Sequence, residues 1–475
     1  MRASLVPTTI LAAALAACGG TDSGPSVTCG TGTTLMDGTC VATGGSNTGG
    51  DTCGAGTHLD GTTCVPDDNT VQAAPTATSI DPPAAGLTGS VLFTITGTGF
   101  AGSNVTDLHV FFGDPTNANC EATLGTSTAT TIAGEVPFAC SLSPSVTVTI
   151  QTNLGTATLP FNYLMLFAGD GDGGGSVGAG GDVYVIDPLA QLSFDLGQAT
   201  DANNKPYAYS GMDFDATGTL YGVTSGDSPA DVAAGTLSQL VLIDLSTGAV
   251  TVKGPAVDAD LFPYYVTDVK FTSGALYGLG FWYDGADWER TLVTISTVDG
   301  TVTPVGASTV DDTLTGGLAV DGAGTLVAAV NGAGADANSN SPTTGEYDTV
   351  NVMDGTLTSA ATLDWPVGAP IQAMTTFPAS TPVVLAIIDD GWYGAVNANL
   401  YQAPQTPPVG ETLALIDPTA TGTDPIVNPL FELPAQIGAS THVDALAVPP
   451  STLVLARQLP KTGWTHLAAG TRAVR

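Results

Sequence analysis

Two segments of this 475-residue chain bring tryptophan, tyrosine and aspartate together within a few positions. Flat aromatic rings beside carboxylates suit the binding of a sugar, or the capture of a peptide that carries basic groups. The alternative is that the rings pack the bases of loops while the acids keep the surface soluble. The candidate binding residues are Trp282, Tyr283, Asp284, Asp287 and Trp288 in the first segment, and Asp389, Asp390, Trp392 and Tyr393 in the second.

A third acidic segment, Asp170-Gly171-Asp172-Gly173, offers the oxygen ligands that calcium prefers. Asp170 and Asp172 are therefore candidate metal ligands. The segment is not an EF-hand loop, because it lacks a third acidic ligand and Gly181 stands where the bidentate glutamate belongs. The sequence indicates no definite cofactor, and an irregular calcium site is the one candidate.

Two motifs that suggest catalysis or nucleotide binding occur in unsuitable surroundings. Gly174–Gly178 has the spacing of a nucleophile elbow but stands in a glycine run, without the strand and helix that an elbow needs. Gly97–Gly102 has the spacing of a dinucleotide-binding loop, yet no helical pattern follows it. We therefore assign no catalytic residue.

The elements that must position the candidate residues are short β-strands. Sixty glycines and 31 prolines favour strands and turns over long helices. Over residues 164–457 a strand–turn–strand unit recurs about every fifty residues, as in Met212–Gly222 and Val269–Gly278. An early hairpin at Val183–Pro188 lacks its first half, and a last unit at Leu446–Leu455 lacks its second half. Joining the two would close a β-propeller of about five blades.

Loop lengths place the candidate binding residues on one face of this propeller. The loops between the second and third strands of each repeat are long, and long loops on a rigid scaffold are where binding residues concentrate. His442, Asp444 and Asp268 would face the central channel instead. In propellers similar to gluconolactonase such channel residues bind a metal, but the matching glutamate and asparagine are missing here, which favours a structural role.

Residues 74–163 have a different pattern. β-rich runs such as Val91–Thr96 and Val146–Ile150, bounded by Gly, Pro and Asn, predict a small antiparallel sandwich. The segment resembles the IPT/TIG family of immunoglobulin-like domains, through motifs that follow one another along its whole length. These motifs are Ser79–Pro82, Ile95–Phe100, Val110–Gly113, Val136-Pro137, Asn153–Gly155 and Phe161–Tyr163. The resemblance implies an immunoglobulin-like fold.

Six of the seven cysteines form an even set that an oxidising compartment would pair. Two pairs close loops of equal spacing and nearly equal sequence, and two cysteines remain as a third pair. The expected disulfides are Cys29–Cys40, Cys53–Cys64 and Cys120–Cys140. A zinc site is disfavoured because no Cys-x-x-Cys occurs. The rest of residues 18–73 is rich in Gly, Thr, Ser and Asp, which predicts a flexible stalk.

The seventh cysteine, Cys18, follows a short apolar run that ends in Leu15-Ala16-Ala17. This stretch resembles the bacterial lipobox, which implies a signal peptide over residues 1–17 and a lipid anchor on Cys18. Gly19 after the cysteine favours, by the same resemblance, the outer membrane or cell surface. The alternative is an ordinary secretory signal, so export is expected in both cases.

In the C-terminal tail, residues 458–475, Leu459–Gly463 matches the sequence of a sortase sorting signal. The apolar span that follows such a signal is missing, and we interpret the motif as a chance match.

Only nine Lys and Arg stand against 44 Asp and Glu, for a formal charge of −35. So acidic a surface repels phosphate, which excludes nucleic acid as a partner. The sequence therefore predicts an all-β exported lipoprotein with a disulfide-looped stalk, an immunoglobulin-like sandwich and a propeller. The expected partners are the membrane, through the lipid, and a surface protein or carbohydrate. Two alternatives stay open: a metal-dependent hydrolase or lactonase that uses the channel, and a structural envelope protein without a discrete ligand.

Overall fold

The protein is described by a computed structural model in which the chain forms two units, Met1–Ala73 and Ala74–Arg475. The described residues are four short strands before residue 67, then 73–171, 180–226, 234–310, 316–330, 345–363, 371–378, 381–389, 411–420, 426–432, 443–455, 457, 459, 461 and 465–466. Among them, no helix is long and apolar enough to cross a membrane.

The first unit contains two short hairpins. Strand β1 (Thr33–Met36) pairs with β2 (Thr39–Ala42), and β3 (Thr57–Asp60) pairs with β4 (Thr63–Pro66). Cys18, Cys29, Cys53 and the side chains of Cys40 and Cys64 lie outside the described part. Lipidation at Cys18 and the pairs Cys29–Cys40 and Cys53–Cys64 therefore stay predictions.

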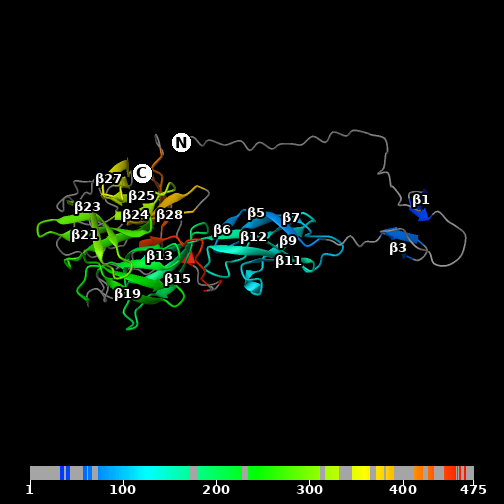
Figure 1. The fold of residues 1–475 in the computed structure, drawn as a ribbon, viewed down its shortest axis with the longest axis horizontal. Coiled ribbons are helices and arrows are strands. Elements are labelled where there is room, and N and C mark those ends of the chain that lie inside the picture. Colours follow the sequence, from blue (N-terminus) through cyan, green and yellow to red (C-terminus); the bar gives the residue numbers. More distant parts are fainter. Residues whose placement is uncertain are drawn as a thin grey trace. The chain divides into compact units, whose positions relative to one another are not determined.

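The second unit begins with a sandwich of two four-stranded sheets, blue and cyan in Figure 1. One sheet has the order β5 (Thr76–Asp81), β7 (Leu92–Thr98), β10 (Thr131–Glu135) and β9 (Thr123–Ser127). The other has the order β6 (Ala84–Gly86), β12 (Gly155–Leu164), β11 (Ser145–Thr152) and β8 (His109–Phe112). Burial alternates residue by residue along β7, because successive side chains of a strand point to opposite faces.

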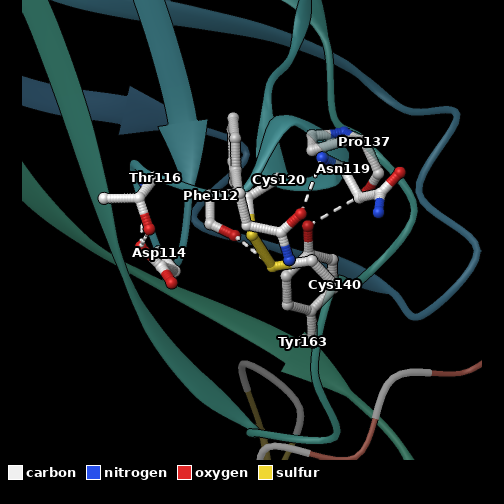
Figure 2. Close-up of a disulfide and its surroundings, with 9 residues drawn as sticks. Phe112, Asp114, Thr116, Asn119, Cys120, Pro137, Cys140 and Tyr163 are labelled. Atoms are coloured by element: carbon white, nitrogen blue, oxygen red, sulfur yellow. Dashed lines mark hydrogen bonds between the residues drawn. A yellow bond between two sulfur atoms is a disulfide. The ribbon is translucent and has the colours of Figure 1, made fainter.

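Aromatic rings and one disulfide hold the sandwich together. Phe112 and Phe161 meet edge to face with ring centroids 4.8 Å apart, and Phe93 lies 5.3 Å from Phe112. The short 3-10 turn Ala118–Cys120 carries the cysteine that bonds to Cys140, as the sequence predicted. Figure 2 shows this disulfide beside Phe112, whose carbonyl lies 3.4 Å from the Cys140 sulfur. The hydroxyl of the buried Tyr163 donates a hydrogen bond to the carbonyl of Pro137 at 3.0 Å.

Five antiparallel sheets follow in the described part of the chain, green to red in Figure 1. Four are built from consecutive strands. One sheet consists of β16 (Tyr209–Phe214), β17 (Leu220–Thr224), β18 (Gln239–Asp244) and β19 (Ala249–Pro255), and the next of β20 (Tyr265–Thr272), β21 (Ala275–Tyr283), β22 (Trp288–Ile295) and β23 (Val302–Val310). The following sheet consists of β24 (Gly316–Val320), β25 (Leu326–Val330), β26 (Glu346–Val350) and β27 (Leu357–Thr362). The last of the four consists of β28 (Ile371–Phe377), β29 (Val383–Asp389), β30 (Glu411–Ile416) and β31 (Val427–Glu432).

The remaining sheet combines both ends of this region. Strand β32 (Val443–Ala447) pairs with β13 (Leu166–Asp170), which continues to β14 (Asp182–Asp187), β15 (Leu192–Gln198) and the short β33 (Thr465–His466). The first strands of the sheets contact one another in the cyclic order β32, β16, β20, β24, β28 and again β32. This ring of inner strands is a propeller, closed by the union of early and late segments that the sequence predicted.

One detail of that prediction was wrong. Leu446–Leu455 was expected to form a strand–turn–strand unit, but only its first residues are in a strand, β32, and residues 448–455 leave the sheet. The second strand comes instead from β13, in which every residue is buried. A strand buried on both faces lacks the polar alternation by which half-buried strands are recognised.

Within the second unit, the sandwich and the propeller share a hydrophobic core that includes Phe161, Phe214 and Leu453. The fully buried carboxylate of Asp187 accepts hydrogen bonds from the backbone N–H and hydroxyl of Thr88, at 2.9 and 2.8 Å. The segment after β32 also crosses between them, because Leu142 N–H donates to the carbonyl of Arg457 at 3.2 Å. These contacts join the two domains directly.

Candidate functional site

The first predicted binding segment forms the tip of the hairpin between β21 and β22. Tyr283 stands directly opposite Trp288 in the strand register, and their ring centroids lie 5.7 Å apart. The carboxylate of Asp284 accepts hydrogen bonds from the backbone N–H groups of Ala286 and Asp287, at 2.7 and 2.9 Å. These bonds lower the pKa of Asp284 and fix the turn that carries the two rings. Asp287 is exposed beside them.

A neighbouring loop adds aromatic residues that sequence analysis missed. The link from β19 to β20 turns at Asp258, whose carboxylate accepts from the N–H groups of Asp260 and Phe262, both at 2.9 Å. Phe262 lies 6.3 Å from Tyr264, which in turn lies 5.4 Å from Trp282, between ring centroids. The run Leu261-Phe262-Pro263-Tyr264-Tyr265 is visible in the sequence and was the signal that could have found them.

We use the name aromatic surface for two groups of residues: Phe262, Tyr264 and Trp282 with the adjacent Leu261, and the separate pair Tyr283 and Trp288. Because neighbouring strand residues point to opposite faces, Trp282 and Tyr283 lie on opposite sides of the hairpin. Trp282 packs against the core between the sheets β16–β19 and β20–β23, and Trp288 packs against the core between the sheets β20–β23 and β24–β27. The exposed members are Leu261, Phe262 and Tyr283, with exposed fractions of 77%, 40% and 50%. The two tryptophans therefore anchor the loops, while the exposed rings are available to a ligand.

The second predicted segment cannot be placed beside the first. Asp389 ends β29, but its side chain lies outside the described residues, as do Asp390, Trp392 and Tyr393. Their role in binding stays a prediction.

The calcium prediction is likewise untested. Asp170 ends β13 and is fully buried, while Asp172 lies outside the described part of the chain. Within the described ranges no three His, Cys, Asp or Glu side chains are grouped so as to hold a metal ion.

In the propeller channel, Asp268 on β20 is fully occupied by internal bonds. Its Oδ2 accepts from the backbone N–H of Leu318 on β24, at 2.8 Å, and of Met374 on β28, at 3.1 Å. Its Oδ1 accepts from its neighbour Val269 N–H at 2.8 Å and from the Lys270 ammonium at 3.1 Å. Burial raises the pKa of Asp268 to about 6, while Lys270 acts in the opposite direction.

The Lys270 ammonium completes this arrangement. It lies 3.1 Å from the carbonyls of Met212 on β16 and Leu446 on β32, and 2.9 Å from that of Val269. The Asp268–Lys270 pair thus bonds to the backbone of all five inner strands. His442 lies outside the described residues, and Asp444 lies half-buried in β32. The geometry gives Asp268 a structural role, as the sequence favoured.

On the face of the short turns, a cavity of about 950 Å³ opens beside this pair. Its lining includes Asp213, Lys270 and Tyr221 of the propeller and Tyr163 of the sandwich. Asp213 accepts from the N–H of Phe271 at 2.7 Å, and burial raises its pKa to about 6. This cavity lies away from the aromatic surface, which occupies the long-loop face.

Comparison with solved structures gives distant likenesses, of which three are described. A structural genomics protein of unknown function from Bacteroides thetaiotaomicron matches with 14% identity and a TM-score of 0.30, over 78% of this chain and 74% of the other. An oligogalacturonate lyase in complex with manganese matches with 12% identity and a TM-score of 0.27, over 62% and 63%. The Dos1 propeller matches with 10% identity and a TM-score of 0.27, over 76% and 85%. Likenesses this distant carry no information about the activity of this chain.

Family comparison is informative for the sandwich. No curated protein matches the chain. A family model does match residues 75–163, where the order of motifs and the paired four-stranded sheets led us to expect an immunoglobulin-like domain. This part of the chain is an IPT/TIG domain.

Proposed function

We propose that the protein is an exported, non-catalytic binding protein that recognises carbohydrate through the exposed rings of the aromatic surface. The observation that carries the proposal is the pair of fixed turns at Asp258 and Asp284, which hold Phe262 and Tyr283 exposed before any ligand arrives. Rings already fixed in place lose little conformational freedom on binding, so more of the contact energy is retained as affinity.

The alternative of a channel hydrolase has less support. A catalytic metal needs ligands with free lone pairs, whereas each oxygen of Asp268 already accepts two hydrogen bonds. A surface protein as ligand remains the closest competitor, because exposed aromatic residues are also typical of protein interfaces.

The test is a binding screen of the full chain against soluble polysaccharides, followed by calorimetry on any that is retained. Tyr283→Ala and Phe262→Ala should each weaken binding by about tenfold, which is about 1.4 kcal/mol. Met353→Ala is the control, since Met353 is a large apolar side chain that is 85% exposed in another turn. Wild-type affinity in both aromatic variants would contradict the proposal. Retention of a surface protein but no polysaccharide would favour the competitor.

Export and anchoring form a separate part of the proposal, supported by the apolar run and small residues before Cys18. Cells expressing the protein should incorporate labelled palmitate into it, and Cys18→Ala should abolish the label. A labelled Cys18→Ala protein would contradict lipidation at this position.

A further inference from the structure

A second cavity, of about 390 Å³, lies between the propeller sheets β20–β23 and β24–β27. Its charged lining consists of Arg290 on β22, Glu346 and Asp348 on β26, and Asp354 in the following turn. Leu279, Leu292 and Leu357 form an apolar wall beside them. Glu346 and Asp348 are two positions apart in one strand, so both side chains point to the same side of the sheet.

Asp348 is the unusual member of this group. It is 3% exposed, and its Oδ1 has no hydrogen-bond partner among the residues that the structure describes. A buried carboxylate oxygen without a donor is costly, because it has given up its bonds to water. Burial and the neighbouring charge of Glu346 raise the pKa of Asp348 to about 6, although Arg290 acts against them. Oδ1 of Asp348 therefore lacks a donor among the described residues, and the positive charge of Arg290 does not offset burial and the charge of Glu346.

The remaining lining indicates what kind of ligand would supply a hydrogen-bond donor and positive charge. The three carboxylates of the lining, Glu346, Asp348 and Asp354, exceed the single guanidinium of Arg290 by two charges. A bare metal ion fits poorly, since within the described residues no three acidic, His or Cys side chains converge. The leucine wall suits carbon atoms attached to a cation.

We propose that this cavity binds an organic ammonium group, whose N–H donors bond to Asp348 and Glu346 while its attached carbons contact the leucine wall. A lysine side chain and an amino sugar both present this chemistry. The cavity is separate from the exposed rings of Tyr283 and Phe262, so this inference and carbohydrate binding by the aromatic surface can fail independently.

The test is calorimetry on the full chain at pH 7.5 with two ammonium probes, N-acetyl-lysine amide and glucosamine. Each has a neutral counterpart, N-acetyl-norleucine amide and N-acetylglucosamine. We expect saturable binding of at least one ammonium probe and none of its counterpart, and the probe that binds identifies the source of the ammonium group. Absence of saturable binding by both ammonium probes at millimolar concentration would overturn the proposal, as would equal binding of a neutral counterpart.

Variants assign the binding to this cavity. Asp348→Asn keeps the shape but removes the charge, and should weaken ammonium binding at least tenfold. Glu346→Gln, at a half-buried position, is a second variant that perturbs packing less and should also weaken binding. Asp299→Asn is the control, because Asp299 is the exposed turn residue of the preceding sheet that corresponds to Asp354. Unchanged affinity in both Asp348→Asn and Glu346→Gln would refute the assignment.

Discussion

Replacing Lys270 by methionine should destabilise the propeller strongly. The Lys270 side chain is 3% exposed, and its ammonium lies within 3.1 Å of carbonyls on β16, β20 and β32 as well as of Asp268. Methionine fills a similar volume but leaves those carbonyls without a donor and the Asp268 carboxylate buried without its cation. Removing one partner of a buried ion pair costs about 3–5 kcal/mol, and we expect a loss of unfolding free energy in this range.

The assay is urea unfolding followed by tryptophan fluorescence. All five tryptophans lie outside residues 75–163, so the signal does not come from the IPT/TIG domain. Lys205→Met is the control, since Lys205 is exposed. In the double variant Asp268→Asn/Lys270→Met the uncompensated charge is gone, so part of the loss should be recovered. A loss below about 1 kcal/mol for Lys270→Met would refute the inference that this pair joins the inner strands.

Three further predictions follow from described contacts. The Cys120–Cys140 disulfide joins cysteines that are 20 residues apart, and replacing both by alanine should lower the unfolding free energy of the sandwich by about 3 kcal/mol. The loss can be measured by following unfolding of the Cys120→Ala/Cys140→Ala variant with circular dichroism. Asp284→Ala should speed hydrogen exchange at the amides of Ala286 and Asp287, while the amides of the Asp258 turn exchange as before. Asp348→Asn should be more stable than wild type at pH 7. Raising a carboxyl pKa from 3.8 to about 6 costs at most about 3 kcal/mol above pH 6, and the advantage should vanish below pH 4, where Asp348 is protonated in both folded and unfolded chains. Equal stability of the two proteins in urea at pH 7 would contradict this reasoning.

The strand pattern could be predicted because local sequence determines it. Within Val91–Thr96, residues Phe93–Thr96 alternate between apolar and polar, and they lie in β7. Tight turns with glycine, such as Ala216–Gly218 between β16 and β17, separate the strands of the repeats. Strand β13 was missed as a blade strand because uniform burial removes the alternation. Its pairing with β32 depends on residues almost three hundred positions away, whose contact no local pattern reports.

The site was less predictable because partners, rather than residue types, determine what a side chain does. Asp284 was predicted to contact a ligand, which stays a prediction, and no local pattern reported that its carboxylate accepts two N–H bonds of its own turn. Asp268 receives donors from β24 and β28, and these donors are backbone groups, which carry no side-chain signal. Phe262 became part of the aromatic surface because a link between sheets passes close to the β21–β22 hairpin.

The same distinction changes what the acidity of this protein means. Asp215 and Asp321, in equivalent turns of two sheets, each accept hydrogen bonds from two backbone N–H groups. Asp244 and Asp417 accept backbone N–H bonds in the turns between the third and fourth strands of their sheets. Such bonds lower the pKa of Asp215, Asp244 and Asp417. Many of the carboxylates that make up the charge of −35 therefore stabilise turns, so their number does not by itself indicate a cationic partner, although they stay ionised and still repel phosphate. A buried carboxylate oxygen that lacks such a donor is more informative, which is why Asp348, with its Oδ1, is the residue to test for a cationic ligand.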